Sequence, residues 1–508
     1  MEFFLNLYEG FQAALGPQLL FYCAVGVTAG TAVGVLPGIG PLVAISVLFP
    51  ITFHVPPDAA VILLAGIYFG AQYGGSTASI LLNLPGTASN AVTCIDGYPM
   101  ARDGRAGKAL FMTTIASFFG GTVSLIALMI FTPLIVGIAL KFGSPEYFAL
   151  MVLGLIAAAT LASSSPLRGI VMVVLGVLLS LVGTDVNTGA YRFTFGMSSL
   201  ADGLGLVPLA MGLFGVAEVI ERLVSGRVAG KPETVGLKSM LLTRDETRRT
   251  FMPMVRGSLC GIFSGILPGA GPSLGAFLAY GLEKRVSPNS ANFGKGAIEG
   301  IAAPEAANNA SVQAAFIPTL SLGIPGDAIM ALILGALVVH GIQPGPNVIP
   351  QNPELFWSLV ASFWIANILL LVLNFPLIGL WVKMLTIPYS ILYPAVIMFI
   401  CAGVFSLRLS GFDVLIVLLF GAVGYFFNLV RLPTAPLLLG FILGTPLEQH
   451  LRRAMIISRG DAWVFLERPI SAVLLALSAL LILGAMAAAL IRLRRGGGMS
   501  RRDRVREN

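Results

Sequence analysis

Long apolar runs recur along the whole chain, and short stretches rich in Gly, Pro and polar residues separate them. A helix that crosses about 30 Å of hydrocarbon needs roughly 20 residues, so the pattern predicts about 10–13 transmembrane segments. We therefore predict an all-α polytopic membrane protein. The clearest apolar runs are residues 109–140, 147–162, 169–182, 356–382, 387–405, 412–426 and 470–491.

One Gly/Pro interruption occurs twice, once in each half of the chain. GVLPGIGP begins at residue 34, and GILPGAGP begins at residue 265. Proline removes a helix N–H donor and glycine favours turning, so each octet is predicted to be the tip of a helical hairpin or a broken helix. The alternative is a mere kink in a continuous helix. The predicted tips are Pro37, Gly38 and Gly40 in the first copy and Pro268, Gly269 and Gly271 in the second.

A second landmark follows each octet: a block of small polar residues around a Pro-Gly pair, at 85–86 and at 325–326. A Pro-Leu-x-x-Gly motif ends each series. Because the landmarks recur in one order, we predict a two-fold internal repeat. The predicted segments are an N-terminal segment (1–17), the first repeat (18–222), a basic linker (223–253), the second repeat (254–450), and a C-terminal transmembrane helix with a basic tail (451–508).

The distribution of Lys and Arg indicates that the two repeats are inverted. Between octet and Pro-Gly pair, loop 50–59 has no Lys or Arg, whereas the equivalent loop 283–295 has three. After the Pro-Gly pair the asymmetry reverses, since residues 102–108 contain three Lys or Arg and residues 340–356 contain none. Basic residues mark cytoplasmic loops, so equivalent loops fall on opposite sides of the membrane, as in many secondary transporters.

The same rule places the central linker and the C-terminal tail in the cytoplasm. Composition agrees with a membrane setting, because 56% of the residues are hydrophobic and 11% are charged, against about 25% charged in soluble domains. We therefore interpret the net charge of +7 as a topology signal and expect no nucleic-acid partner. Arg452, Arg453, Arg459 and Arg468 disagree with this topology, and we predict an interfacial segment there.

Polar residues cluster at the broken helices of both repeats, which predicts a binding site near the membrane midplane. Neither block contains Lys or Arg, so an anionic ligand would be held by helix N-termini and by hydroxyl or amide donors. The alternative is that the hydroxyl groups only join helices. The candidate substrate-binding residues are Ser76, Thr77, Asn83, Pro85, Gly86, Thr87, Asn308, Asn309, Ser311, Pro325 and Gly326.

Two acidic residues in the second repeat are candidates for coupling to an ion. Glu305 precedes an Asn-Asn pair, and Asp327 directly follows the second Pro-Gly pair. Because acids inside a membrane are usually functional, we predict that Glu305, Asn309 and Asp327 take a coupling Na⁺ or H⁺. The alternative is that each acid caps a helix N-terminus in interfacial water.

Nothing in the sequence indicates an enzyme, a cofactor or a resident metal. Cys23, Cys94, Cys260 and Cys401 are scattered singly, and the three histidines are far apart. The chain has no GxSxG elbow, no paired His/Glu ligands and no GxxxxGK[ST] phosphate loop. We expect no metal beyond a transported Na⁺.

Taken together, the motifs resemble those of the large membrane subunit of the tripartite tricarboxylate transporters. The resemblance implies a secondary transporter of the bacterial inner membrane that is driven by an ion gradient and takes up a carboxylate. It also implies two partners, a small four-helix membrane subunit and a periplasmic solute-binding protein. The motifs span residues 18–450 and are GVLPGIGP, FGAQYGGSTASILLNLPGTASN, DGYPMARDGRAGKAL, PLAMGLFGVAEV, GILPGAGP, APEAANNA and LGIPGDAIMA.

The predicted mechanism is alternating access. In its elevator version, the octets and Pro-Gly blocks move against a scaffold formed by residues 109–140 and 356–382. The alternative function is an anion channel, because channels also use re-entrant loops and inverted repeats.

Overall fold

The computed structural model describes residues 2–36, 40–161, 165–185, 188–225, 236–385, 387 and 389–496. Six described helices are long and apolar enough to cross a membrane, and five shorter apolar helices accompany them. The described strands are β1 (Gly183–Thr184) and β2 (Tyr191–Arg192), which pair antiparallel. The prediction of an all-α polytopic membrane protein is confirmed.

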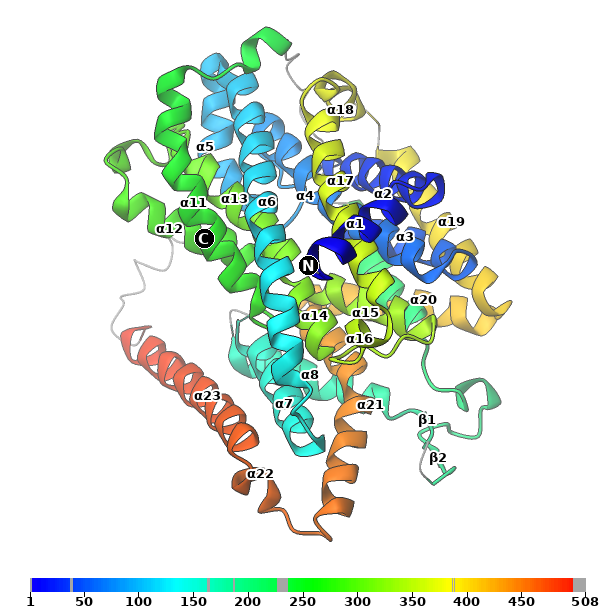
Figure 1. The fold of residues 1–508 in the computed structure, drawn as a ribbon. Helices are drawn as coiled ribbons and strands as arrows, with labels where there is room; N and C mark the ends of the chain where they lie inside the picture. Colours follow the sequence, from blue (N-terminus) through cyan, green and yellow to red (C-terminus); the bar gives the residue numbers. More distant parts are fainter. Residues whose placement is uncertain are drawn as a thin grey trace.

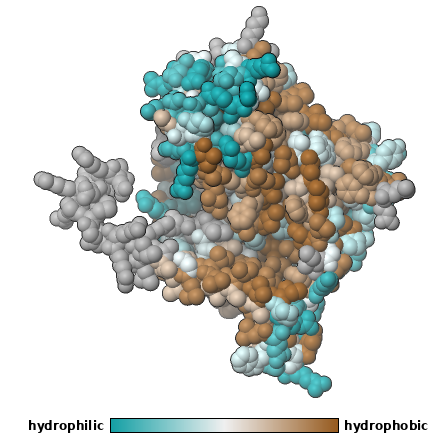
Figure 2. All heavy atoms as spheres, turned by 60° about the vertical axis from the view of Figure 1, so that its left-hand side comes forward, coloured by the Kyte–Doolittle hydropathy of each residue, from teal (hydrophilic) through white to brown (hydrophobic). Residues whose placement is uncertain are grey.

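The outer surface carries many exposed hydrophobic side chains, as a surface in contact with lipid requires. Figure 2 shows hydrophobic side chains over the middle of one face and hydrophilic ones toward its upper and lower ends. Exposed leucines occur on α20 and α23, among them Leu415, Leu419, Leu480 and Leu483. Such a surface faces hydrocarbon at little cost, whereas water would disfavour it.

Helices of the two predicted repeats follow one another in a similar order (Figure 1). After α1 (Glu2–Ala14), the first repeat contains α2 (Pro17–Val35), α3 (Pro41–Leu48), η1 (Phe49–His54), α4 (Pro57–Leu82), α5 (Ala91–Met100), η2 (Ala101–Arg105), α6 (Ala106–Ala139), α7 (Ser144–Leu161), α8 (Pro166–Ser180), η3 (Ser198–Leu200), α9 (Leu206–Ala210), η4 (Met211–Val216) and α10 (Ala217–Ser225). The remainder comprises η5 (Leu237–Met240), α11 (Arg244–Ile266), α12 (Gly271–Val286), η6 (Ser290–Asn292), α13 (Glu299–Ala314), α14 (Phe316–Leu322), α15 (Ala328–Val339), α16 (Val348–Gln351), α17 (Pro353–Asn374), α18 (Ile378–Met384), α19 (Tyr389–Arg408), α20 (Gly411–Leu429), α21 (Thr434–Ile457), α22 (Val464–Glu467) and α23 (Pro469–Gly496).

Each octet interrupts helical structure. In the second repeat α11 and α12 pack against each other as a helical hairpin, and a Cβ atom on Gly275 would lie only 2.3 Å from Ser264 Oγ. The turn between them needs glycine, because Gly269 and Gly271 have φ angles of +76° and +61°. In the first repeat α2 ends at Val35 and α3 begins at Pro41.

The Pro-Gly pairs also end helices in equivalent ways. Asn83 caps the C-terminus of α4 and Gly323 caps that of α14, both in the left-handed conformation. Asn83 and Gly323 lie 240 positions apart, as do Gly86 and Gly326. A common left-handed cap followed by a Pro-Gly pair is what a structural repeat predicts.

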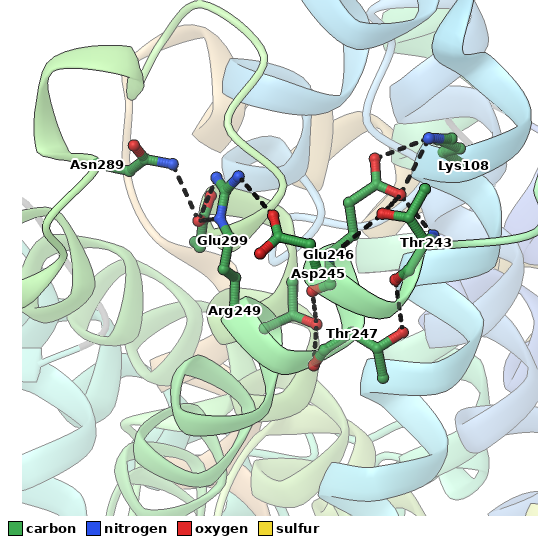
Figure 3. Close-up of polar contacts among 9 residues, drawn as sticks. Lys108, Thr243, Asp245, Glu246, Thr247, Arg249, Asn289 and Glu299 are labelled. Atoms are coloured by element: carbon green, nitrogen blue, oxygen red, sulfur yellow. Dashed lines mark hydrogen bonds and ion pairs between the residues drawn. The ribbon is translucent and has the colours of Figure 1, made fainter.

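Loops that the charge pattern places on one side of the membrane contact one another. Figure 3 shows Lys108, at the start of α6, beside Glu246 of α11, with Lys108 Nζ 2.8 Å from Glu246 Oε1. In the same close-up, Arg249 of α11 and Asn289 both donate hydrogen bonds to Glu299 Oε1. The Lys108–Glu246 pair joins a residue after the first Pro-Gly pair to one before the second, as inverted repeats would place them. The contacts to Glu299 join α11 and the loop before α13 to the start of α13.

The loops assigned to the other side also meet. His340 Nε2, in the loop after α15, lies 2.9 Å from the carbonyl oxygen of Thr52 in η1. Two of the arginines that disagreed with the topology are paired with acids of the first repeat, Arg452 with Asp185 at 3.0 Å and Arg468 with Glu146 at 3.3 Å. These ion pairs tie α21 and the segment before α23 to the first repeat.

The structure corrects one predicted helix. Residues 356–382 do not form a single span, because α17 ends at Asn374 and α18 begins at Ile378. Pro376 lies in the break, and Trp381 Nε1 donates a hydrogen bond of 2.8 Å to the carbonyl of Leu373 across it. Proline cannot continue the backbone ladder, so the apolar run hides a change of direction. Of this run only α17 therefore remains as a candidate scaffold helix, together with α6.

Candidate functional site

Both octets and both Pro-Gly blocks contribute to one cavity of about 810 Å³. Its size is within the range of small-molecule sites. The first repeat supplies residues 40–43 and 85–89, and the second supplies residues 269–274 and 327–329. Four segments that are far apart in sequence therefore surround the same space.

Two helices begin at this cavity with uncapped N-termini. The first residues of α3 and of α12 line it, and neither Gly40 nor Ala270, at the N-cap positions, makes a side-chain cap. The first N–H groups of a helix have no partner within the helix, and its dipole is positive at this end. The two N-termini can therefore bind an anionic group, as helix N-termini commonly do.

The remaining polar groups of the cavity come mainly from α4 and the two Pro-Gly blocks. Thr87 Oγ1 lies 3.0 Å from Gln72 Oε1 and 2.8 Å from Ser89 Oγ. Asp327 caps α15, since its Oδ1 atom accepts a 2.8 Å hydrogen bond from the Met330 N–H, and Tyr68 donates to its other oxygen. The cap agrees with the alternative that Asp327 is a helix N-cap.

The Pro-Gly pairs fit closely against the octets. A Cβ atom on Gly86 would lie 2.3 Å from the carbonyl oxygen of Gly34, and one on Gly326 would lie 3.1 Å from that of Gly265. Gly34 and Gly265 are the first residues of the two octets. The Gly269 N–H also donates a 2.7 Å hydrogen bond to the Gly326 carbonyl. Each octet and its Pro-Gly pair therefore form one packed unit.

The structure divides the predicted site residues that it describes into three groups. Pro85, Gly86, Thr87, Asp327, Gly40, Gly269 and Gly271 line the cavity. Ser76, Thr77, Glu305, Asn308, Asn309 and Ser311 lie outside that lining and are buried where helices pack together. Asn83, Pro268, Pro325 and Gly326 border the helix breaks without lining the cavity, and Pro37 and Gly38 lie outside the described residues. The binding roles of all these residues stay predictions.

Glu305 lies at the centre of the second group. Its side chain is 1% exposed, and three uncharged side chains surround the carboxylate. Asn90 Nδ2 donates to Glu305 Oε1 at 3.1 Å, Thr93 donates to the same oxygen, and Ser117 donates to Oε2 at 3.4 Å. This polar cluster joins α5, α6 and α13 inside the bundle.

Sequence reasoning did not select several residues of these two regions. Tyr68, Gln72 and Ser76 recur every four residues, which places them on one face of α4. That spacing could have identified Tyr68 and Gln72. Ser117 did not stand out, because it is one of several Ser and Thr residues spread along the apolar run of α6, among them Thr113, Thr114, Thr122 and Ser124.

Comparison with known proteins identifies the family. Residues 20–439 match the family described as "Tripartite tricarboxylate transporter TctA family". A protein of Agrobacterium vitis described as "Uncharacterized 52.8 kDa protein in TAR-I ttuC' 3'region" is 51% identical over 479 residues, which are 94% of this chain and 95% of that protein. A second Agrobacterium vitis protein, "Uncharacterized protein in TAR-II ttuC' 3'region", is 54% identical over 226 residues, which are 44% of this chain and 93% of that protein. No solved structure matches the chain. The match over most of the chain shows that this protein belongs to the tripartite tricarboxylate transporter TctA family and is a membrane transporter component.

Proposed function

We propose that this protein is the membrane subunit of a secondary transporter that imports a carboxylate, of tricarboxylate type, across the bacterial inner membrane. A periplasmic solute-binding protein would deliver the substrate, and a small four-helix membrane protein would be the second membrane subunit. The C-terminal tail would lie in the cytoplasm. The observation that supports this proposal most directly is the cavity lined by both octets and both Pro-Gly blocks.

The uncapped N-termini of α3 and α12 are the proposed carboxylate donors. They come from equivalent positions of the two repeats and reach the same cavity. Thr87 and Ser273 add hydroxyl groups to the lining. A second cavity of about 820 Å³ contains Arg453 and His450, but neither octet nor either Pro-Gly pair lines it. We therefore place the substrate in the first cavity.

Charge within the cavity supports coupling to a cation. Its described lining includes Asp327 and Glu218 and contains no Lys, Arg or His. Two like unit charges about 6 Å apart repel by roughly 3 kcal/mol at an effective dielectric constant near 20. A carboxylate substrate would therefore enter more readily together with Na⁺ or H⁺, which makes symport the expected mechanism.

Alternating access would move the octets and Pro-Gly blocks relative to α6 and α17. The contact between α6 and α13 is made of small groups, and Ser124 Oγ donates a 2.7 Å hydrogen bond to the Ala310 carbonyl. The elevator version predicts that this contact changes between states. A disulfide between cysteines introduced at positions 124 and 310 should form in one ligand condition and not in another. A crosslink that forms equally with and without substrate and ion would contradict the movement.

The carboxylate site can be tested by adding one negative charge at a helix N-terminus. At Gly40 a Cβ atom meets nothing within 4 Å among the described atoms, and the backbone angles of −68° and 170° suit any residue. Gly40→Asp would place a carboxylate beside the anion site, while Gly40→Asn adds a similar cap of equal size without charge. We expect Gly40→Asp to raise the apparent KM for carboxylate uptake by about 10-fold or more, from the repulsion between like charges. Equal apparent KM values for the two variants would refute the site.

A further inference from the structure

The polar cluster around Glu305 is built inside the bundle, away from the lining of the substrate cavity. We define this Glu305 cluster as Ser76, Asn90, Thr93, Ser117, Glu305, Asn308 and Asn309, each of which is at most 4% exposed. Within the described chain no Lys, Arg or His forms an ion pair with Glu305. A buried carboxylate without a counter-charge is strongly disfavoured, so the cluster needs a bound cation or proton.

The hydrogen bonds favour a metal cation over a proton. The amide or hydroxyl groups of Asn90, Thr93 and Ser117 all donate to Glu305. Asn309 Nδ2 in turn donates to Ser117 Oγ at 2.7 Å, which directs the Ser117 hydroxyl hydrogen toward the carboxylate. A protonated Glu305 would need an acceptor, whereas an ionised Glu305 matches these donors and keeps lone pairs for a cation.

The cluster also contains a buried side-chain amide that makes no hydrogen bond among the described residues. Asn308 is 1% exposed, and neither its Oδ1 nor its Nδ2 atom has a hydrogen-bond partner among the described residues. Asn308 follows Glu305 by three residues, which places both side chains on one face of α13. Buried amides are normally paired, so an unpaired one beside a buried carboxylate points to a missing ligand.

Two positions of this cluster correspond to apolar residues in the other predicted repeat, so the fold does not require polar groups at these positions. Ser76 and Asn309 correspond to Phe316 and Phe69 at the same spacing of 240 positions as the two Pro-Gly pairs. These two phenylalanines pack with Phe363 of α17, and the ring centroids of Phe69 and Phe363 lie 4.8 Å apart. Aromatic side chains therefore fill the equivalent place, while the Glu305 cluster holds a carboxylate together with hydroxyl and amide groups.

We propose that the Glu305 cluster binds Na⁺, with the Glu305 carboxylate, the Asn308 carbonyl oxygen and neighbouring hydroxyl oxygens as ligands. Hard cations prefer such oxygen ligands. The described residues contain no group of three or more His, Cys, Asp or Glu that would suit a transition metal. The role of this ion as the coupling ion rests on the proposed transport function, but its binding does not.

Asn90 connects the Na⁺ site to the substrate cavity. Its Nδ2 atom donates to Glu305, and its Oδ1 atom accepts a 2.6 Å hydrogen bond from Thr87, which lines the cavity. Occupancy of the Na⁺ site would fix Asn90 and with it Thr87. Because coupling between two sites is reciprocal, substrate should also strengthen Na⁺ binding. Asp327 differs from Glu305, since the N-terminus of α15 already stabilises its negative charge.

The test measures Na⁺ binding to the purified full-length protein in detergent, without substrate. The apparent melting temperature is followed while NaCl replaces choline chloride at constant ionic strength. We expect Na⁺ to stabilise the wild-type protein and the control variant Asp413→Asn, which alters a buried acid of α20 outside the cavity and the cluster. We expect Glu305→Gln to bind Na⁺ about 100-fold more weakly. An equal response of Glu305→Gln and wild type, or a wild type that responds only to lowered pH, would overturn the Na⁺ site. If Glu305→Gln does not fold, Ser117→Ala replaces it, with an expected 10-fold weakening; unchanged affinity would overturn the proposal.

The link between the Na⁺ site and the substrate cavity is tested separately with Asn90→Ala. With a transported carboxylate present, Na⁺ should stabilise the wild type at a lower concentration, and Asn90→Ala should remove this effect of the substrate. If Asn90→Ala keeps the full effect, the link is wrong. Na⁺ binding that persists when no carboxylate is transported would leave this site in place and reject the proposed function instead.

Discussion

The close packing of Gly86 predicts different effects of the same substitution at two equivalent glycines. A Cβ atom on Gly86 would lie 2.3 Å from the Gly34 carbonyl oxygen and 2.4 Å from Gly75 Cα, so both obstacles are backbone atoms. At Gly326 the nearest atoms are the Ala315 Cβ at 3.0 Å and the Gly265 carbonyl oxygen at 3.1 Å. Neither glycine has a left-handed backbone, so added strain comes from packing alone.

These distances determine how much stability each substitution should cost. Gly86→Ala needs a backbone shift of about 1 Å to restore ordinary contact distances. Overpacking of this kind costs about 1–3 kcal/mol, and we expect about 3 kcal/mol because a helix must move. Gly326→Ala needs a shift of a few tenths of an ångström, and we expect it to cost less than about 1 kcal/mol.

The assay compares the apparent melting temperatures of the two purified variants and their carboxylate uptake at matched membrane expression. Gly86→Ala should melt several degrees lower than wild type and lose most uptake, while Gly326→Ala should stay close to wild type in both. If Gly86→Ala is as stable and active as wild type, or if Gly326→Ala is the more damaged variant, the proposed packing of the first Pro-Gly pair is wrong.

Three further predictions follow from the fold and the buried contacts. In a cysteine-free background, a cysteine at His54 should react with an impermeant reagent from outside and one at Ser287 should not; labelling from the same side would contradict the inverted repeats. Burial acts to raise the pKa of Glu246, but hydrogen bonds from Lys108 and Thr243 lower it below its ordinary 4.5. The Lys108–Glu246 pair should therefore stabilise the protein by about 0.5 kcal/mol above that pH and lose this contribution as the pH falls below it, in a double-mutant cycle; a coupling energy equal at pH 7 and pH 4 would argue against the pair. Asn309→Leu removes the 2.7 Å hydrogen bond to Ser117 and should weaken the apparent affinity for Na⁺ or substrate about 10–150-fold; unaltered affinities for both would mean that Asn309 is only structural.

The helix breaks could be predicted from sequence because they have a local cause. Proline and glycine disrupt helical hydrogen bonding wherever they occur, and α3 begins at Pro41, within the predicted turn. Pro376 has the same effect, but the long apolar run around it suggested a single helix. Local chemistry thus gave the positions of both octets and both Pro-Gly pairs.

The division of the polar residues between cavity and cluster could not be predicted in this way. In α4 the whole apolar window is buried, so no contrast between a lipid face and a protein face shows where Ser76 or Thr77 points. The location of Glu305 depends on α5, α6 and α13 meeting in three dimensions. Those contacts join residues more than 180 positions apart, and no short motif encodes them.

The central claim is that one cavity between two inverted repeats carries a carboxylate together with a cation. The most direct measurement is uptake of labelled tricarboxylate into right-side-out membrane vesicles that contain the complete transport system, with the Na⁺ and H⁺ gradients imposed separately. We predict saturable uptake that accumulates substrate against its own gradient when the Na⁺ gradient is directed inward, and that stops when this gradient is removed. Substrate flux that does not saturate and follows only the electrochemical gradient of the substrate would contradict this account and indicate a channel.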